Sequence, residues 1–341
     1  MRRSVVEIDL GALRRNVARL REVAAPAELW AVVKADGYGH GALDVGRSAL
    51  EAGASALCVA TAPEGAVLRS AFPDARILVL GPLGADENVA REARLEAAVS
   101  TPPIPEGLPV HLKVETGMGR WGMTAEEALA VPRGEVVGVM SHLATADEDD
   151  EAFAREQIER FGEIAAAFPG VTAHLANSAA ALRFSDAHFD AVRCGVALYG
   201  LSPYGRDPAE QGLEPVLSWR SYVAAAKTLA PGESTGYGRG FVADRPTRIG
   251  LVPVGYGDGL SRGLEGAEVL LEGERRRILG RISMDSFAVE LGEAREGAVV
   301  TLIGDGLLVE EHARRLGTIN YEVTVGIRSD PTRAERRLVD G

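Results

Sequence analysis

The stretch Leu29-Trp30-Ala31-Val32-Val33-Lys34-Ala35-Asp36-Gly37-Tyr38-Gly39-His40-Gly41 joins an apolar run to a glycine-rich turn. Five consecutive apolar residues without alternation are typical of a β-strand that is buried on both faces, as in a parallel sheet. The lysine lies where this strand ends and its loop begins. Glycines in such a loop let the backbone approach a ligand closely, so we expect a binding site at this end of the strand.

Lysine is rare in this chain. It occurs three times, at Lys34, Lys113 and Lys227, although lysine and arginine together number 37. A lysine retained against this bias is a candidate for chemistry that needs a primary amine, because an always-charged guanidinium can neither form an imine nor accept CO₂. At Lys34 the amine lies beside backbone that can approach a phosphate, which is the arrangement that a pyridoxal phosphate (PLP) Schiff base requires.

Length and composition limit the classes of protein. A chain of 341 residues predicts two domains, and a net charge of −12 with a pI near 5.1 argues against a nucleic-acid or anionic-membrane partner. No apolar run is long enough to span a bilayer, so we expect a cytoplasmic protein. Cys58 and Cys194 form no disulfide framework, and the six histidines lack metal-ligand spacing, so no metal is expected.

From Leu29 to about Arg193, short apolar runs alternate with amphipathic stretches, which indicates repeated β-α units on a parallel sheet. The eight predicted strands are Leu29–Lys34, Ala56–Ala60, Arg76–Gly81, Glu96–Ser100, Val110–Glu115, Val136–Leu143, Val171–Asn177 and Phe189–Cys194. Polar residues stand at or near the carboxyl ends of four of these runs, namely Lys34, His142, Asn177 and Arg193. Because barrel enzymes assemble their sites at those ends, we predict a (β/α)8 TIM-type barrel over residues 1–213.

After about Leu213 the pattern changes to strands joined by turns, so residues 214–341 are predicted to form a β-rich C-terminal domain. The predicted strands are Ser218–Leu229, Tyr237–Ala243, Arg248–Val254, Ala267–Leu271 and Arg277–Leu291, with a hairpin turn at 272–274. Helices are predicted over Ala12–Ala25, Glu148–Phe168 and Val309–Leu316, the last ending at Gly317. Capping boxes are expected where Thr61 precedes Glu64 and where Thr124 precedes Glu127.

The lysine motif is similar to the PLP-lysine signature of alanine racemases, and further matching motifs follow in order along nearly the whole chain. They are His111–Arg120, Ser141–Asp147, Ala176-Asn177-Ser178, Val192–Gly195, Gly236-Tyr237-Gly238, Gly255–Gly259, Arg281–Asp285 and Ile319–Val323. One such motif is weak evidence, whereas eight collinear ones are not expected by chance. The resemblance implies a PLP-dependent isomerase that interconverts L- and D-alanine and supplies D-alanine for peptidoglycan.

The resemblance also implies catalytic roles. Lys34 binds PLP as a Schiff base and, once released, serves as one base, while Tyr237 from the partner subunit serves as the second base on the opposite face of the substrate. Arg193 faces the pyridine nitrogen of PLP, and because it only donates, it leaves that nitrogen unprotonated. His142 links Arg193 to Tyr237 by hydrogen bonds. A tyrosine that must reach a neighbouring site implies a homodimer with sites at its interface.

The remaining site residues are assigned by the same resemblance. The cofactor phosphate is expected to bind Tyr38, Ser178, Tyr321 and the backbone N–H groups of Gly195 and Val196, with Asn177 supporting them. The substrate carboxylate is expected at Arg120 and the backbone of Met284, with Tyr256 and Asp285 near the entrance. Lys113 corresponds to a lysine that the family can carbamylate, which would orient Arg120.

Three alternatives stay open. The chain could be a barrel-type PLP racemase for serine or for a broader set of amino acids, or a related amino-acid decarboxylase. Decarboxylases commonly place an acidic partner on the ring nitrogen, which Arg193 opposes. A non-catalytic PLP carrier would share the lysine, but the β domain with Tyr237 weighs against a carrier.

Overall fold

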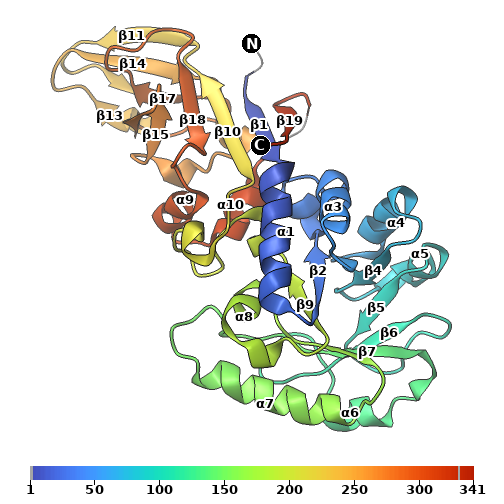
Figure 1. Ribbon diagram of the computed structural model, residues 1–341. Helices are drawn as coiled ribbons and strands as arrows, with labels where there is room; N and C mark the ends of the chain where they lie inside the picture. Colours follow the sequence, from blue (N-terminus) through green and yellow to red (C-terminus); the bar gives the residue numbers. More distant parts are fainter. Residues whose placement is uncertain (1–2, 329–330) are drawn as a thin grey trace. The chain divides into compact units, whose positions relative to one another are not determined.

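The computed structural model describes residues 3–328 and 331–341, whose contacts divide the chain into two compact units (Figure 1). The barrel unit comprises residues 13–204 and 211–213. The sheet unit comprises the chain up to Ala12, residues 205–210 and the chain from Glu214 onward. No helix in the described ranges has both the length and the apolar character needed to cross a lipid bilayer.

Eight parallel strands close the barrel unit in sequence order, and the last pairs with the first. They are β2 (Glu28–Val32), β3 (Ala56–Val59), β4 (Arg76–Val79), β5 (Glu96–Val99), β6 (Val110–Lys113), β7 (Val136–Met140), β8 (Thr172–His174) and β9 (Ala191–Cys194). Each of the eight predicted runs overlaps one of these strands, so the predicted barrel is confirmed. These strands could be predicted from the sequence because strands buried on both faces need apolar residues at almost every position.

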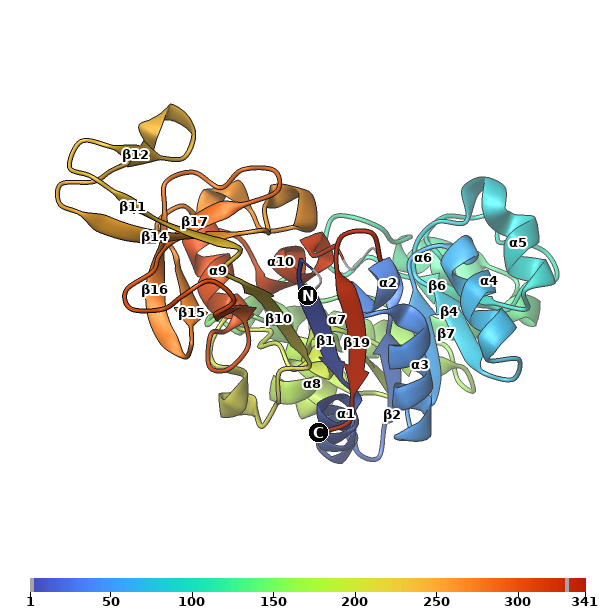
Figure 2. The same cartoon turned by 90° about the horizontal axis from the view of Figure 1, so that it is seen from above.

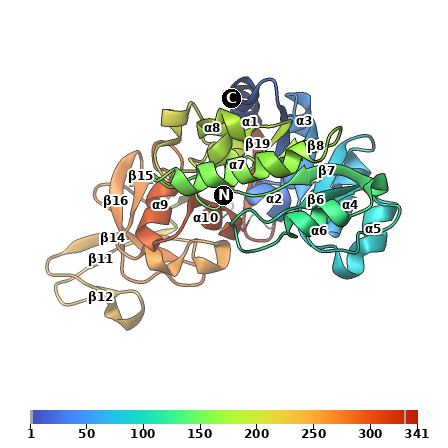
Figure 3. The ribbon, with the colours of Figure 1, turned by 90° about the horizontal axis from the view of Figure 1, so that it is seen from below.

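Helices follow most of these strands, and several are drawn along the outside of the barrel (Figure 3). Helix α1 (Leu10–Ala24) precedes β2, and the helices that follow barrel strands are α3 (Ala42–Glu51), α4 (Ala62–Ala71), α5 (Glu87–Glu92), α6 (Ala125–Ala130), α7 (Ala152–Ala166) and α8 (Ser178–Arg183). Both predicted capping boxes form, at the starts of α4 and α6. The helix predicted over Glu148–Phe168 is the shorter α7. It begins at Ala152, because the Asp150 side chain accepts the Ala152 N–H and the chain turns there.

A nine-stranded sheet organises the sheet unit, in the order β11-β14-β17-β16-β15-β18-β10-β1-β19. The strands are β1 (Val5–Asp9), β10 (Leu217–Tyr222), β11 (Ala225–Leu229), β14 (Thr247–Val252), β15 (Glu268–Leu271), β16 (Glu274–Leu279), β17 (Phe287–Glu290), β18 (Val299–Ile303) and β19 (Glu335–Val339). Strand β1 pairs antiparallel with β10 and parallel with β19, as Figure 2 shows for β1 and β19. The first residues therefore group with the sheet unit, although the sequence pattern placed them with the barrel.

Three predicted strands of the C-terminal half were wrong in extent. Ser218–Leu229 is split between β10 and β11, and Arg277–Leu291 is split between β16 and β17, because turns interrupt both runs. Within Tyr237–Ala243 only β13 (Phe241–Val242) is extended, paired with β12 (Ser234–Thr235). Tyr237–Arg239 instead forms a 3₁₀ turn, since positive φ angles at Gly238 and Arg239 are incompatible with a strand.

Two helices complete the sheet unit. Helix α9 (Val309–Leu316) ends at Gly317, which has a φ of 66°, as predicted. Helix α10 (Asn320–Gly326) was not predicted as a helix and carries Tyr321. Its β-branched residues Val323, Thr324 and Val325 have low intrinsic helix propensity, which explains why the local sequence did not indicate it.

Candidate active site

The lysine signature folds into a left-handed turn directly after β2. Ala35, Asp36, Gly37 and Tyr38 have φ angles of 52°, 50°, 62° and 54°. Hydrogen bonds hold the turn, among them that from the Gly37 N–H to the carbonyl of Val33 at 2.9 Å. Left-handed backbone costs roughly 1–2 kcal/mol for each residue with a Cβ, and such strain is concentrated at functional sites. The turn thus marks the residues after Lys34 as part of a site.

Lys34 lies in an environment that favours its neutral amine. Burial, followed by the positive charge of Arg120, lowers the pKa of Lys34. Burial and the charges of Arg193, Arg120 and Lys34 lower the pKa of Lys113 to about 8. Within residues 3–328 and 331–341, neither ammonium group makes a hydrogen bond or an ion pair. Four cationic side chains therefore influence one another here, which is an excess of positive charge suited to an anion.

Arg193 is buried near the end of β9 and donates to His174 of β8 and to the segments that directly follow β7 and β8. Its Nη1 contacts Nδ1 of His174 at 2.7 Å and the His174 carbonyl at 2.8 Å. Its Nη2 donates to the carbonyls of Ser141 and Leu175 and lies 3.4 Å from Nδ1 of His142. In the described part of the chain, Nε makes no such bond. Burial lowers the pKa of Arg193 to about 10, so the guanidinium stays charged at neutral pH.

A chain of hydrogen bonds runs from Arg193 across the barrel interior to β4. Nε2 of His174 contacts Nδ1 of His111 at 2.8 Å, and Nε2 of His111 contacts a Glu96 carboxylate oxygen at 2.8 Å. Nε of Arg76 donates to both Glu96 oxygens. Because the arginine can only donate and the carboxylate can only accept, each histidine must accept at Nδ1 and donate from Nε2. We call this series the histidine relay.

The surroundings of the histidine relay fix these protonation states. Burial lowers the pKa of both His111 and His174, so both imidazoles are neutral. Burial would raise the pKa of Glu96, but the hydrogen bond from His111 and the charge and hydrogen bond of Arg76 hold it below its ordinary value. A Cβ at Gly138 would lie 1.9 Å from Nδ1 of His111, so only glycine leaves room for the ring.

His142 is held from both sides. Since Arg193 donates to Nδ1, the neutral ring carries its proton on Nε2, and burial and the Arg193 charge keep the pKa of His142 well below its ordinary value. Gln157 of α7 fixes the backbone, because Nε2 donates to the His142 carbonyl at 3.2 Å and Oε1 accepts the Ala144 N–H at 2.8 Å. The ring therefore has a set orientation, and its Nε2–H has no acceptor among residues 3–328 and 331–341.

The predicted phosphate-binding residues of the barrel unit lie together in the segments that follow β2, β8 and β9. The Ser178 hydroxyl accepts the Gly195 N–H at 3.0 Å and the Ala197 N–H at 3.4 Å. A Cβ at Gly195 would lie 2.4 Å from the Tyr38 hydroxyl. Asn177 caps α8 by accepting the Ala180 N–H. Hydroxyls and amides thus converge on a small region from three loops.

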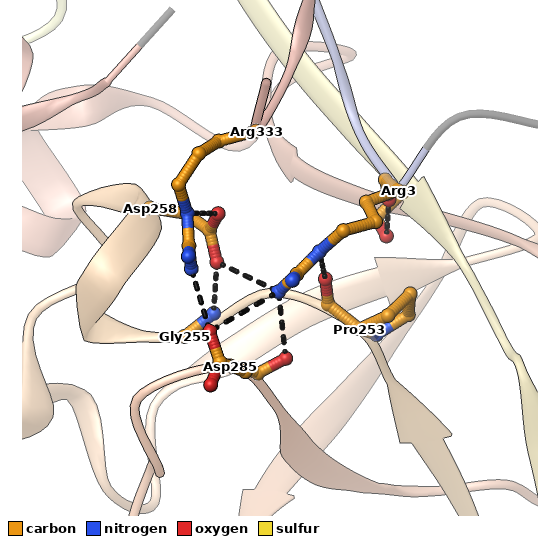
Figure 4. A network of polar contacts seen from close by, with 7 residues as sticks. Arg3, Pro253, Gly255, Asp258, Asp285 and Arg333 are labelled. Atoms are coloured by element: carbon orange, nitrogen blue, oxygen red, sulfur yellow. Dashed lines mark hydrogen bonds and ion pairs between the residues drawn. The ribbon is translucent and has the colours of Figure 1, made fainter. Parts of the chain in front are cut away.

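The other predicted site residues belong to the sheet unit. Tyr237 is 65% exposed on its 3₁₀ turn, and Met284 is 53% exposed. Tyr256 is also exposed and begins a second 3₁₀ turn. Asp285 is not a free carboxylate, because it pairs with Arg333 at 2.7 Å (Figure 4). The predicted roles of these residues, and of Tyr321 on α10, stay predictions.

Sequence reasoning missed the residues that support Arg193. His111, His174 and Gln157 are buried and the Glu96 side chain is only 20% exposed, yet the spacing of the histidines in the sequence did not indicate that two of them meet. One signal was available on β6, where His111 and Lys113 are two residues apart and therefore lie on the same face of the strand. A charged or polar side chain inside a short apolar run needs a buried hydrogen-bond partner. The same rule applies to Glu96 on β5 and to His174 on β8.

The chain matches two family models in succession. The model of the alanine racemase N-terminal domain matches residues 8–203, and that of the alanine racemase C-terminal domain matches residues 216–335. Alanine racemase from Nostoc sp. is 38% identical over 362 residues, covering 96% of this chain and 94% of the relative. The similarity therefore extends over almost the whole length of this chain and of its relative.

Solved structures of alanine racemases have the same fold as this chain. Alanine racemase from Streptomyces coelicolor A3(2) superposes with a TM-score of 0.92 at 38% identity, covering 99% of this chain and 98% of the other. Alanine racemase from Bartonella henselae, described with covalently bound pyridoxal phosphate, gives a TM-score of 0.91 at 27% identity and covers 98% and 99%.

Proposed function

Because this chain belongs to the alanine racemase family, we propose that it interconverts L- and D-alanine with PLP, using Lys34 and Tyr237 as its two bases. The assignment rests chiefly on Lys34, whose lowered pKa and position at the end of the first barrel strand suit an amine that must lose its proton. D-alanine made in this way would serve peptidoglycan synthesis, and the reaction would take place in the cytoplasm without a nucleic-acid or membrane partner.

The barrel unit fits PLP in chemical terms. Lys34 supplies the amine, and the excess positive charge around it offsets the cofactor phosphate and the substrate carboxylate. Tyr38, Ser178 and the N–H groups of Gly195 and Val196 would hold the phosphate, with Tyr321 added from the sheet unit. Their hydroxyls and amides are the donor types that barrel enzymes use after the seventh and eighth strands.

Bound PLP would supply an electron sink that acidifies the α-hydrogen of alanine. The residues of the chain then have to move a proton between the two faces of the α-carbon. Nζ of Lys34 takes or gives the proton on one face, since its lowered pKa favours the neutral amine. The hydroxyl oxygen of Tyr237 acts on the other face, because a single base cannot reach both faces without reorienting.

Tyr237 is proposed to act in the site of a second subunit. Its side chain is largely exposed and stands on a tight turn, so it is free to enter a neighbouring site. The protein would therefore be a homodimer in which the sheet unit of each subunit completes the site of the other. Light scattering at the assay concentration tests this, because a fully active monomer would contradict it.

Arg193 and His142 are proposed to set the proton positions around these bases. Arg193 has Nε–H left for the pyridine nitrogen, and a guanidinium that only donates keeps that nitrogen unprotonated. His142 accepts from Arg193 at Nδ1 and so presents Nε2–H toward the Tyr237 oxygen. That donor would hold the Tyr237 oxygen in place as the second base.

The substrate carboxylate is proposed to bind Arg120 and the backbone N–H of Met284. Lys113 is proposed to be carbamylated, because a pKa of about 8 leaves a substantial neutral fraction that can react with CO₂. The carbamate would replace a cation by an anion beside Arg120 and Arg193. It would thereby orient Arg120 and relieve the repulsion among the four cationic side chains.

Racemisation is tested on the purified protein with PLP. Circular dichroism of an L-alanine solution should fall to zero without loss of alanine, and D-alanine should give the mirror-image decay. L-serine and other enantiopure amino acids define the substrate range. Consumption of alanine with release of CO₂ would instead favour the decarboxylase.

Two variants test the base assignment. Lys34→Ala should abolish racemisation. Tyr237→Phe should slow α-hydrogen exchange from one enantiomer by at least about 100-fold more than from the other, since general acid-base catalysis contributes 10²–10⁴-fold. Equal slowing of both enantiomers would show that the two residues do not act on opposite faces.

A further inference from the structure

Two arginines from opposite ends of the chain meet beside the loops that carry Tyr256 and Met284. Arg3 precedes β1 and Arg333 precedes β19, and these strands pair in parallel with Val5 opposite Glu335. Two residues earlier in the same register, Arg3 and Arg333 stand side by side (Figure 4). The pairing of the two termini thus delivers a pair of cations to one place in the sheet unit.

Both arginines bind the same two aspartates. Nε of Arg333 donates to Asp258 at 2.7 Å and its Nη2 donates to Asp285 at 2.7 Å. Nη2 of Arg3 donates to Asp258 at 3.3 Å and to the Asp285 carbonyl at 3.0 Å, while its Nε donates to the Pro253 carbonyl. We call these four residues the arginine clamp. It has no net charge, and the Asp258 side chain within it is buried.

The arginine clamp joins two loops that already touch through their backbones. The Tyr256 N–H donates to the Ser283 carbonyl at 3.1 Å, and the Gly257 N–H donates to the Met284 carbonyl at 2.8 Å. A Cβ at Gly255 would lie 2.1 Å from the Ser283 carbonyl oxygen, so the loops are too close for a side chain there. Asp258 also accepts the Gly255 N–H at 2.9 Å, which fixes the start of the Tyr256 turn.

We infer that Arg3 and Arg333 are positioning residues that hold the Tyr256 and Met284 loops in register and thereby set the KM for the amino-acid substrate. The inference rests on the proposed function, in which the Met284 backbone binds the substrate carboxylate. Neither arginine touches substrate in this scheme. Each acts through the aspartates, and a planar guanidinium suits this role because its separate nitrogens donate to two carboxylates in fixed directions, whereas lysine offers a single nitrogen on a flexible stem.

Arg333→Lys tests the inference, because it keeps the charge beside buried Asp258 but cannot bridge to Asp285. The KM for alanine is expected to rise about tenfold while kcat stays within about twofold, since binding is altered and the bases are not. Arg337→Lys is the matched control. Arg337 also lies on the β19 segment, but it pairs with Glu7 and Glu335 and does not contact either loop.

Hydrogen exchange gives a readout that does not depend on activity. In Arg333→Lys, the amides of Gly255, Tyr256 and Gly257 should exchange at least about tenfold faster than in the wild type, and those in Arg337→Lys should not change. Asp285→Asn, which leaves the Asp258 pairs intact, should give a smaller acceleration confined to the same loops.

Three results would overturn the inference: unchanged exchange at the three amides, faster exchange with an unchanged KM, or a fall in kcat at constant KM. The first would show that the loops hold their register without the arginine clamp. A wild-type protein that does not racemise alanine would instead refute the proposed function, and the exchange data would still decide whether the clamp orders the loops.

Discussion

Replacing Glu96 by glutamine should weaken the barrel unit through the histidine relay. The carboxylate accepts from His111 and, through both oxygens, from Arg76, each at 2.8 Å. If the glutamine amide places its oxygen toward His111, its N–H₂ group faces the Nε–H donor of Arg76. The opposite orientation reverses both histidine tautomers and ends with His174 and Arg193 donors facing each other at 2.7 Å. Either orientation therefore leaves one pair of opposed donors.

The cost follows from the bonds that are lost. Hydrogen bonds to charged groups contribute about 1.5–3 kcal/mol and neutral ones about 1 kcal/mol, so losing the charge and one acceptor should lower the free energy of unfolding by about 2 kcal/mol. Glu28→Gln is the matched control. The Glu28 side chain is 49% exposed and lies 4.0 Å from Arg76, so its replacement should cost less than about 1 kcal/mol.

Urea unfolding followed by tryptophan fluorescence measures both variants, because Trp30 packs on His111 and His174. The ¹⁵N shifts of labelled histidines report their tautomers in the folded protein. If Glu96→Gln unfolds within about 0.5 kcal/mol of the wild type, or loses no more than Glu28→Gln, then the directed hydrogen bonds of the relay contribute no measurable stability and the reasoning is wrong.

Three further predictions concern cofactor, carbamate and pH. Gly195→Ala places a methyl 2.4 Å from the Tyr38 hydroxyl and should lower PLP retention on dialysis at least about tenfold, read by visible absorbance, whereas Gly134→Ala, with open space around it, should not. Intact-mass spectrometry in bicarbonate should show one added CO₂ that is absent from Lys113→Met. Because burial keeps His174 neutral when folded, while unfolded histidine protonates near pH 6.5, its contribution to stability is complete above about pH 6.5 and is lost at lower pH, by up to about 1.4 kcal/mol per pH unit. Urea unfolding between about pH 7.5 and 5.5 should show a smaller slope in His174→Asn.

The barrel was predictable and the sheet largely was not, for a physical reason. Barrel strands are buried on both faces, so continuous apolar runs such as Ala56–Val59 identify them without knowledge of their partners. Strand β1 gives no such information. The alternation of apolar and polar residues in β1 indicates a strand. No local feature of the sequence shows that this strand pairs with residues more than 200 positions away. Pairing of that kind is decided by the whole chain.

The same distinction applies to the site. Lys34 and Arg193 were found because each ends a strand, which is a local property of the sequence. The 3₁₀ turn at Tyr237 was predicted as a strand, since its flanking glycines are compatible with several backbone conformations until neighbouring residues select one. The His111–His174 contact joins residues that are 63 positions apart, and its direction depends on which group at each end can donate.

The fixed direction of each hydrogen bond makes these polar networks specific. A guanidinium only donates and a carboxylate only accepts, so a histidine between Arg193 and Glu96 has one allowed tautomer, and a second histidine in the series has one as well. The arginine clamp has the same property without any histidine, because its arginines donate to every partner. A network whose ends cannot exchange roles has one low-energy arrangement, whereas serine or asparagine at either end would permit several. The rigidity that the proposed proton transfer at Lys34 would require is therefore supplied by residues that are not proposed to take a proton from the substrate.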